Sequence, residues 1–184
     1  MQIQKTILLS QFQPQNNLPK YNIYSSNELK LFNSFVKKLK SEIKFKNVIH
    51  YTLGSELNLN GYGIADLALL EYWPVKKKKM ISQKKILTVF ELKIKDWRKA
   101  LKQAYRYKYY SHKSIVVMPD HNADRAILNL DIFRALGVGL WVYNNKNNSL
   151  RKIYSPRIQR PFSKFAFKKA HSLLMNKSKF PQSF

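Results

Sequence analysis

Apolar residues at helical spacing predict a first helix that begins at Ser26 or Asn27. Its buried stripe would consist of residues three or four positions apart, namely Leu29, Phe32, Val36, Leu39 and Ile43. Lysines occupy the positions between them and are expected to face solvent. Residues 1–25 are polar, and we expect them to form a flexible lead-in. This lead-in could contribute a short strand over residues 3–9.

Three segments with the residue content of β-strands follow this helix. They cover residues 48–53, 64–72 and 86–94. The third segment is mostly apolar, which is typical of a strand at the centre of a sheet. An exposed hairpin tip is predicted between the second and third strands by Pro74 and the lysine run Lys76, Lys77, Lys78 and Lys79.

Helices and strands alternate in the second half of the chain. A helix over 97–111, capped by Asp96, is followed by a strand over 115–118. A helix over 122–136 should end at Gly137, before a strand over 138–143. This order predicts one α/β domain with a central mixed sheet flanked by helices. We expect the core domain to span 26–155 and a basic C-terminal helix and tail to span 156–184.

The net charge indicates what the protein binds. The chain of 184 residues has 34 Lys and Arg against 10 Asp and Glu, a formal net charge of +24. An excess of this size attracts polyanions, so we expect a nucleic acid partner, with DNA ahead of RNA, rather than a membrane surface. The chain has no cysteine, which excludes thiolate metal sites and leaves the cytoplasm as the default location.

Two of the few acidic residues lie inside apolar strand segments. Asp66 is in Ile64–Leu69 and Glu91 is in Val89–Lys93, where an ionised carboxylate is unfavourable without a partner or a metal. Strand alternation places Glu91 and Lys93 on one face, and hairpin pairing would bring Asp66 beside them. This trio could hold Mg²⁺ (or Mn²⁺) for phosphodiester hydrolysis. The alternative is a buried salt bridge that stabilises the sheet.

The same residues resemble a known nuclease pattern. Gly63-Ile64-Ala65-Asp66, then Glu91-Leu92-Lys93, then Gln103-x-x-x-Tyr107 on the following helix is similar to the PD-(D/E)XK nuclease superfamily. The resemblance covers roughly residues 28–143 and implies a restriction-endonuclease-like fold with an αβββαβ core. The usual proline before the first acid is absent, since Ala65 stands there.

The resemblance also implies roles for individual residues. Asp66 and Glu91 would be metal ligands together with the Leu92 carbonyl, and Lys93 would be the catalytic lysine. Gln103 and Tyr107 would contact the phosphate backbone or orient the catalytic groups.

Two further acids are weaker candidates for the site. Glu56 could reach the metal, or it could be a solvated turn residue before the second strand. Glu28 matches an acid that the superfamily often has on its first helix, but it is also an ordinary first-turn glutamate.

Basic residues near the proposed site suggest how nucleic acid would be held. Arg98, Lys102 and Arg106 recur every four residues on the helix after Lys93, and Lys99 lies among them. The alternative for this stripe, and for the hairpin-tip lysines Lys76–Lys79, is a solvated charged surface. The tyrosine-rich run 105–110 is expected to serve packing and phosphate contact rather than stacking on single strands.

Together these patterns predict a Mg²⁺-dependent endonuclease that acts on DNA. Enzymes of the superfamily often act as dimers, so a homodimer is a candidate assembly. The alternatives are a catalytically inactive DNA-binding module of the same fold, or an interaction subunit of a mobile-element or phage complex.

Overall fold

The computed structural model describes residues 25–44, 48–77 and 80–177. The predicted short strand over 3–9, most of the lead-in, and Lys78 and Lys79 lie outside these described residues.

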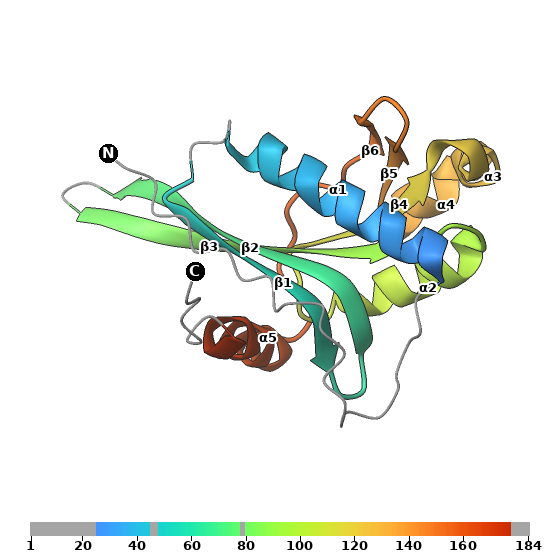
Figure 1. Cartoon of the computed structure of the whole chain (residues 1–184). Helices are drawn as coiled ribbons and strands as arrows, with labels where there is room; N and C mark the ends of the chain where they lie inside the picture. Colours follow the sequence, from blue (N-terminus) through green and yellow to red (C-terminus); the bar gives the residue numbers. More distant parts are fainter. Residues whose placement is uncertain (1–24, 45–47, 78–79, 178–184) are drawn as a thin grey trace, which may run out of the picture.

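A six-stranded mixed sheet forms the centre of the molecule, with the strands in sequence order (Figure 1). The first three strands pair antiparallel, the middle three pair parallel, and the last pair is antiparallel. The strands are β1 (His50–Leu59), β2 (Gly63–Lys77), β3 (Met80–Leu92), β4 (Lys113–Pro119), β5 (Gly139–Asn144) and β6 (Ser149–Tyr154). The α/β class and the mixed sheet are therefore confirmed, whereas β6 was not predicted.

Helices cover both faces of this sheet (Figure 1). Helix α1 (Ser26–Lys44) buries the predicted stripe from Phe32 to Ile43 in one cluster with Leu53, Leu67 and Phe90. Leu29 was wrongly included in this stripe, since it lies in the first turn of the helix and is exposed. The other face carries α2 (Trp97–Tyr107) and α5 (Lys164–Lys177), whose Ala104 and Ala170 belong to the second cluster. A short 3-10 helix (Asp120–Asn122), α3 (Asp124–Leu128) and α4 (Leu130–Leu136) complete the second half.

The helix predicted over 122–136 is wrong as a continuous element. It is interrupted at Asn129, where φ is −111° and ψ is 33°. The Asn129 side-chain amide donates to the Arg125 carbonyl oxygen at 2.7 Å. Asparagine side chains compete in this way for backbone groups, and here the competition coincides with the boundary between α3 and α4.

The first hairpin changes face at Glu56. This residue has a left-handed φ of 49° and lies inside β1, so the alternative that it is a turn residue is wrong, although its side chain is exposed. Leu53 belongs to the cluster under α1, but Leu57 belongs to the cluster under α2 and α5, although both positions have the same strand parity. The local twist at Glu56 therefore moves the end of β1 from one core to the other.

Candidate active site

The predicted acid pair lies on adjacent strands. In the register of β2 and β3, Leu67 pairs with Phe90, so the preceding Asp66 lies across from Glu91. Both side chains are buried, with 7% of Asp66 and 2% of Glu91 exposed. The structure thus brings together the two carboxylates that the sequence singled out.

Asp66 is held by the backbone of the neighbouring strand. Its Oδ2 accepts a hydrogen bond from the Leu92 amide at 2.6 Å. A hydrogen bond to a carboxylate favours the charged form, and this one also fixes the direction of the side chain. Asp66 therefore points toward the end of β3, where Lys93 follows.

Glu91 is held by Tyr107 on α2. The Tyr107 hydroxyl lies 2.7 Å from Glu91 Oε2 and 2.7 Å from the Ile64 carbonyl oxygen. A hydroxyl has only one proton, so it cannot donate fully to both acceptors. This geometry suits a protonated Glu91 that donates to Tyr107, while Tyr107 donates to Ile64.

Electrostatics favours the same protonation state. Burial, and then the nearby charge of Asp66, raise the pKa of Glu91 to about 8, against weaker opposing contributions from Tyr107, Lys93 and Lys99. Burial and the Glu91 charge also raise the pKa of Tyr107 above its usual range, so its hydroxyl stays protonated at neutral pH. The acid pair therefore carries about one negative charge near neutral pH rather than two.

Lys93 follows β3 directly, beside the acid pair. Its amide donates to the Val117 carbonyl oxygen at 3.0 Å, which fixes the backbone, and its Nζ lies 4.0 Å from Glu28 Oε1. Lys93 also lowers the pKa of Glu91, which shows that its charge acts on that carboxyl. An open cavity of about 310 Å³ lies here, lined by Ser25, Asn27, Glu28, Lys93, Ile94, Lys95 and Asp96.

Gln103 is one helical turn from Tyr107 on α2. Its Oε1 is buried and has no hydrogen-bond partner among the described residues. An unsatisfied buried acceptor is unfavourable, so this oxygen is available to a donor that the protein itself does not provide. The hydroxyl of Tyr110 is buried in the same unsatisfied state. The sequence did not single out Tyr110, because no motif distinguishes it from its tyrosine neighbours.

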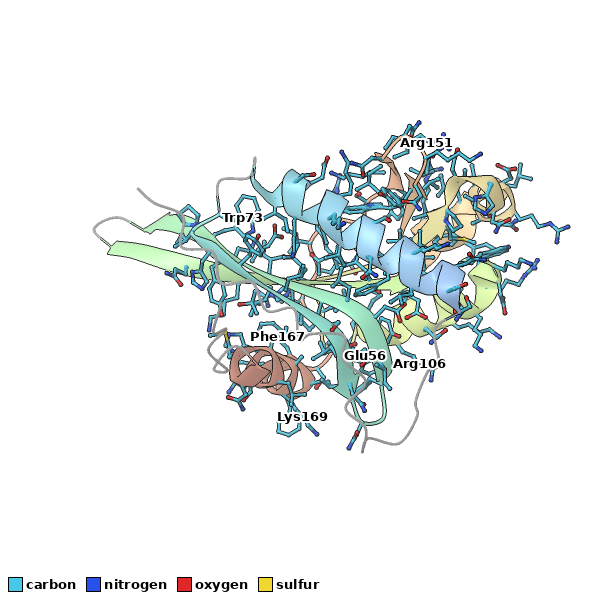
Figure 2. The ribbon with its side chains drawn as sticks, in the orientation of Figure 1. Glu56, Trp73, Arg106, Arg151, Phe167 and Lys169 are labelled. Atoms are coloured by element: carbon cyan, nitrogen blue, oxygen red, sulfur yellow. The ribbon has the colours of Figure 1, made fainter. Side chains whose placement is uncertain are left out.

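The two weaker acid candidates occupy different places. Glu28 lies at the Lys93 cavity. Glu56 lies opposite Asp66 in the β1–β2 register, between the pairs Ser55–Leu67 and Leu57–Ala65, but its side chain is exposed (Figure 2). The structure therefore brings Glu28 to the lysine and leaves Glu56 at the surface of the hairpin.

The donor set fits a hard divalent cation only in part. Within the part of the chain that the structure describes, no group of three or more His, Asp or Glu side chains is placed to hold a metal. The two opposed carboxylates nevertheless repel each other, as the effect of Asp66 on the pKa of Glu91 shows. A divalent cation between them would relieve this repulsion, with backbone oxygen and water as further ligands.

The cationic face of α2 borders the acid pair. Arg98, Lys99, Lys102 and Arg106 are all exposed, and the charge of Lys99 acts on Glu91. Figure 2 shows Arg106 among them. The β2–β3 hairpin instead extends away from the site (Figure 1). Lys77 lies eleven residues beyond Asp66 (77 − 66 = 11), at most about 36 Å along the strand.

Among the described residues, no helix is long and apolar enough to cross a membrane. Comparison with known proteins finds no matching family model, no matching curated protein and no matching solved structure.

Proposed function

We propose that the protein is a metal-dependent nuclease whose site is built on Asp66, Glu91 and Lys93. The observation that carries this proposal is the pair of buried carboxylates facing each other on β2 and β3, with a lysine directly after the second strand. Their order, and Gln103 and Tyr107 on the next helix, support a restriction-endonuclease-like arrangement of the PD-(D/E)XK type.

In this proposal Mg²⁺ is held by Asp66, Glu91 and the Leu92 carbonyl. When bound, it would neutralise charge on the scissile phosphate and activate a water molecule. Glu91 must first lose its proton, because only the carboxylate is a good ligand. Lys93 would place its ammonium group against the phosphate, and Tyr107 would keep the Glu91 side chain in position.

The cations of α2 would hold the phosphates that flank the cut. Arg98, Lys102 and Arg106 are exposed on α2, the helix that also carries Tyr107. Because one helix holds them all, the distances from these cations to the acid pair are fixed. Contacts of this kind give affinity without reading base sequence.

A DNA-binding module without catalysis is the second candidate function. It is favoured by the hydrogen bonds that the protein already makes to both acids, from the Leu92 amide to Asp66 and between Tyr107 and Glu91. Such contacts also occur in a structural polar network that stabilises a sheet.

Plasmid cleavage with Mg²⁺ or Mn²⁺ separates the two functions. The wild type should cut, and Asp66→Asn should lose at least about 100-fold in rate while still shifting DNA in a gel. Asp131→Asn, which changes an exposed carboxylate on α4, is the matched control and should cut normally. Binding without cleavage by the wild type would identify the inactive module instead.

Metal binding is tested without turnover by thermal unfolding. At pH 8.5, Mg²⁺ should raise the Tm of the wild type, because a ligand that binds only the folded state stabilises it. Asp66→Asn should lose this shift and Asp131→Asn should retain it. An equal shift in all three proteins would contradict a metal site at Asp66.

A further inference from the structure

Three exposed aromatic side chains form a continuous surface at the carboxyl end of α2. Tyr105 and Tyr109 are 38% and 41% exposed, and Phe162 is 53% exposed. The Phe162 ring lies 5.5 Å from Tyr109 and 6.4 Å from Tyr105, measured between ring centroids. We call Tyr105, Tyr109 and Phe162 the aromatic surface.

Backbone hydrogen bonds hold this surface in place. The Phe162 amide donates to the Lys108 carbonyl oxygen at 3.1 Å, and the Ser163 amide donates to the Tyr109 carbonyl oxygen at 2.8 Å. The Lys108 ammonium lies over the rings of Tyr105 and Phe162 at 5.5 and 5.1 Å and donates to the Leu136 carbonyl oxygen. The rings are therefore preorganised, which lowers the entropy cost when a ligand binds.

The charge around the aromatic surface selects an anionic ligand. The segments that form it and flank it, residues 97–119 and 145–177, contain no Asp or Glu. Exposed cations lie in the same segments, namely Arg106, Arg157, Arg160 and Lys164. Flat apolar rings among cations complement a ligand that combines flat rings with a polyanionic backbone, which is the chemistry of nucleic acid.

Tyrosine rings connect this surface to the acid pair. Measured between ring centroids, Tyr109 lies 5.1 Å from Tyr62 and Tyr62 lies 6.3 Å from Tyr110. The Tyr110 ring lies 5.9 Å from the Tyr107 ring. Tyr107 contacts Glu91. A strand bound on the aromatic surface would therefore lie close to the candidate site.

We propose that the aromatic surface stacks on unpaired bases, so that the substrate contains single-stranded nucleic acid next to the position of cleavage. In a duplex the base faces are covered by their neighbours, whereas an unpaired base offers its face to an aromatic ring. This deepens the proposed nuclease function and rests on it. It differs from the expectation that the run 105–110 only packs and contacts phosphate, since Tyr105 and Tyr109 are exposed while Tyr107 and Tyr110 are buried.

The test is binding by the full chain in EDTA, measured by fluorescence anisotropy. The probes are labelled oligothymidylate, labelled oligouridylate and a blunt DNA duplex of equal length. The double substitution Tyr109→Leu with Phe162→Leu should weaken oligothymidylate binding about tenfold or more, as expected when base stacking is removed. Duplex affinity should change less than about twofold, since phosphate contacts remain. The ratio of the two single-strand affinities shows whether DNA or RNA is preferred.

Matched variants keep this test decisive. Phe162→Trp, which keeps an aromatic face, should bind oligothymidylate at least as tightly as the wild type. Leu128→Ala removes another exposed apolar side chain, on α3, and should change nothing. If the double variant does not fold, as judged by thermal unfolding, Tyr105→Leu replaces it.

Three outcomes would overturn the proposal. These are unchanged oligothymidylate binding, equal losses for single strand and duplex, and a wild-type oligomer in sedimentation that the double substitution dissociates. The last outcome would assign the surface to protein contact. Because binding is measured without metal, this test does not depend on cleavage, and failure of the nuclease proposal shows only in the plasmid-cleavage assay.

Discussion

Glu91 is a buried carboxyl group whose ionisation is disfavoured by its surroundings. It is 2% exposed, it faces Asp66, and its pKa is raised to about 8, first by burial and then by the Asp66 charge. At neutral pH the folded protein therefore keeps a proton that the unfolded chain releases. Keeping this proton lowers stability increasingly as pH rises above the ordinary pKa, and the proton must be given up before a metal can bind.

Stability should accordingly fall as pH rises through the range set by Glu91. Between about pH 4.5, the ordinary pKa, and about pH 8 the folded state binds more protons than the unfolded state, so ionisation favours unfolding. Glu91→Gln cannot ionise, so without divalent cations its Tm should exceed that of the wild type by an amount that grows from pH 5 to about pH 8 and then levels off. Circular dichroism during heating measures this difference.

Glu42→Gln is a control, because ionisation of Glu42 affects stability in the opposite direction to ionisation of Glu91. The pKa of Glu42 is lowered, chiefly by its hydrogen bond with Lys152, so any stabilisation is present above the ordinary pKa and disappears in acid. A constant difference between Glu91→Gln and the wild type across this pH range would contradict the assigned burial of the Glu91 charge.

The Tyr107 hydroxyl should matter for stability as well as for the site. Tyr107→Phe keeps the ring but leaves the Ile64 carbonyl and Glu91 without this partner. We expect a loss of about 1–3 kcal/mol in the free energy of unfolding, measured with urea at neutral pH. Tyr105→Phe removes an exposed hydroxyl from the same helix and should change stability by less than about 0.5 kcal/mol. Equal effects of the two substitutions would argue against the hydrogen bonds of Tyr107.

At the scale of elements, α5 packs on the bent first hairpin because β1 carries a glycine where the two meet. A Cβ atom built on Gly54 would lie 2.7 Å from Leu174 Cδ2, and Leu174 is fully within the core. A Cβ atom fits at this position only if the end of the Leu174 side chain moves away from β1.

Gly54→Ala should therefore destabilise the protein by about 1–3 kcal/mol through overpacking. Leu174→Ala alone should cost about 2–5 kcal/mol through the cavity that it leaves. The double variant should lose at least about 1 kcal/mol less than the sum of the two losses, since each change relieves the other. Urea unfolding of all four proteins gives this coupling, and strict additivity would mean that the helix does not lie so close to β1.

At the scale of the whole molecule, the net charge of +24 repels itself in the free protein and is favourable beside a polyanion. The cations on the two faces of the sheet differ in their distance from the candidate site. The cations of α2 lie beside the acid pair, whereas Lys30 and Lys37 lie on α1, across the sheet.

DNA affinity should depend steeply on salt, and the dependence should come from the α2 face. Arg98→Ala with Arg106→Ala should reduce the slope of log affinity against log salt by roughly 2, about 0.9 for each phosphate that the protein no longer neutralises. Lys30→Ala with Lys37→Ala removes the same charge from α1 and should leave the slope nearly unchanged. Equal changes in both pairs would mean that the net charge alone attracts DNA, without a defined binding face.

Local periodicity was enough to predict most elements, because helices and strands repeat their buried positions every 3.6 and 2 residues. The stripe of α1 from Phe32 to Ile43 followed from this spacing, whereas β3 followed from its apolar content and the cap at Asp96 from its residue type. Strand parity also predicted that Glu91 and Lys93 share one face, but Lys93 lies beyond the end of β3. Its ammonium group lies near Glu28 of α1, whereas Glu91 contacts Tyr107 of α2. The residues of the missed β6 are intermediate or exposed and none is buried, so β6 has no row of core positions whose spacing would predict a strand.

The sequence by itself thus determined the α/β class, the order of most elements and the candidate acids, since each depends on residues close in the chain. The sequence also predicted that a hairpin would bring Asp66 beside Glu91, which the strand register confirms. Tertiary structure alone decided that burial raises the pKa of Glu91 and that Phe162 joins Tyr105 and Tyr109. These features depend on strand register and on packing between distant segments, where many interactions compete and no local repeat records the outcome.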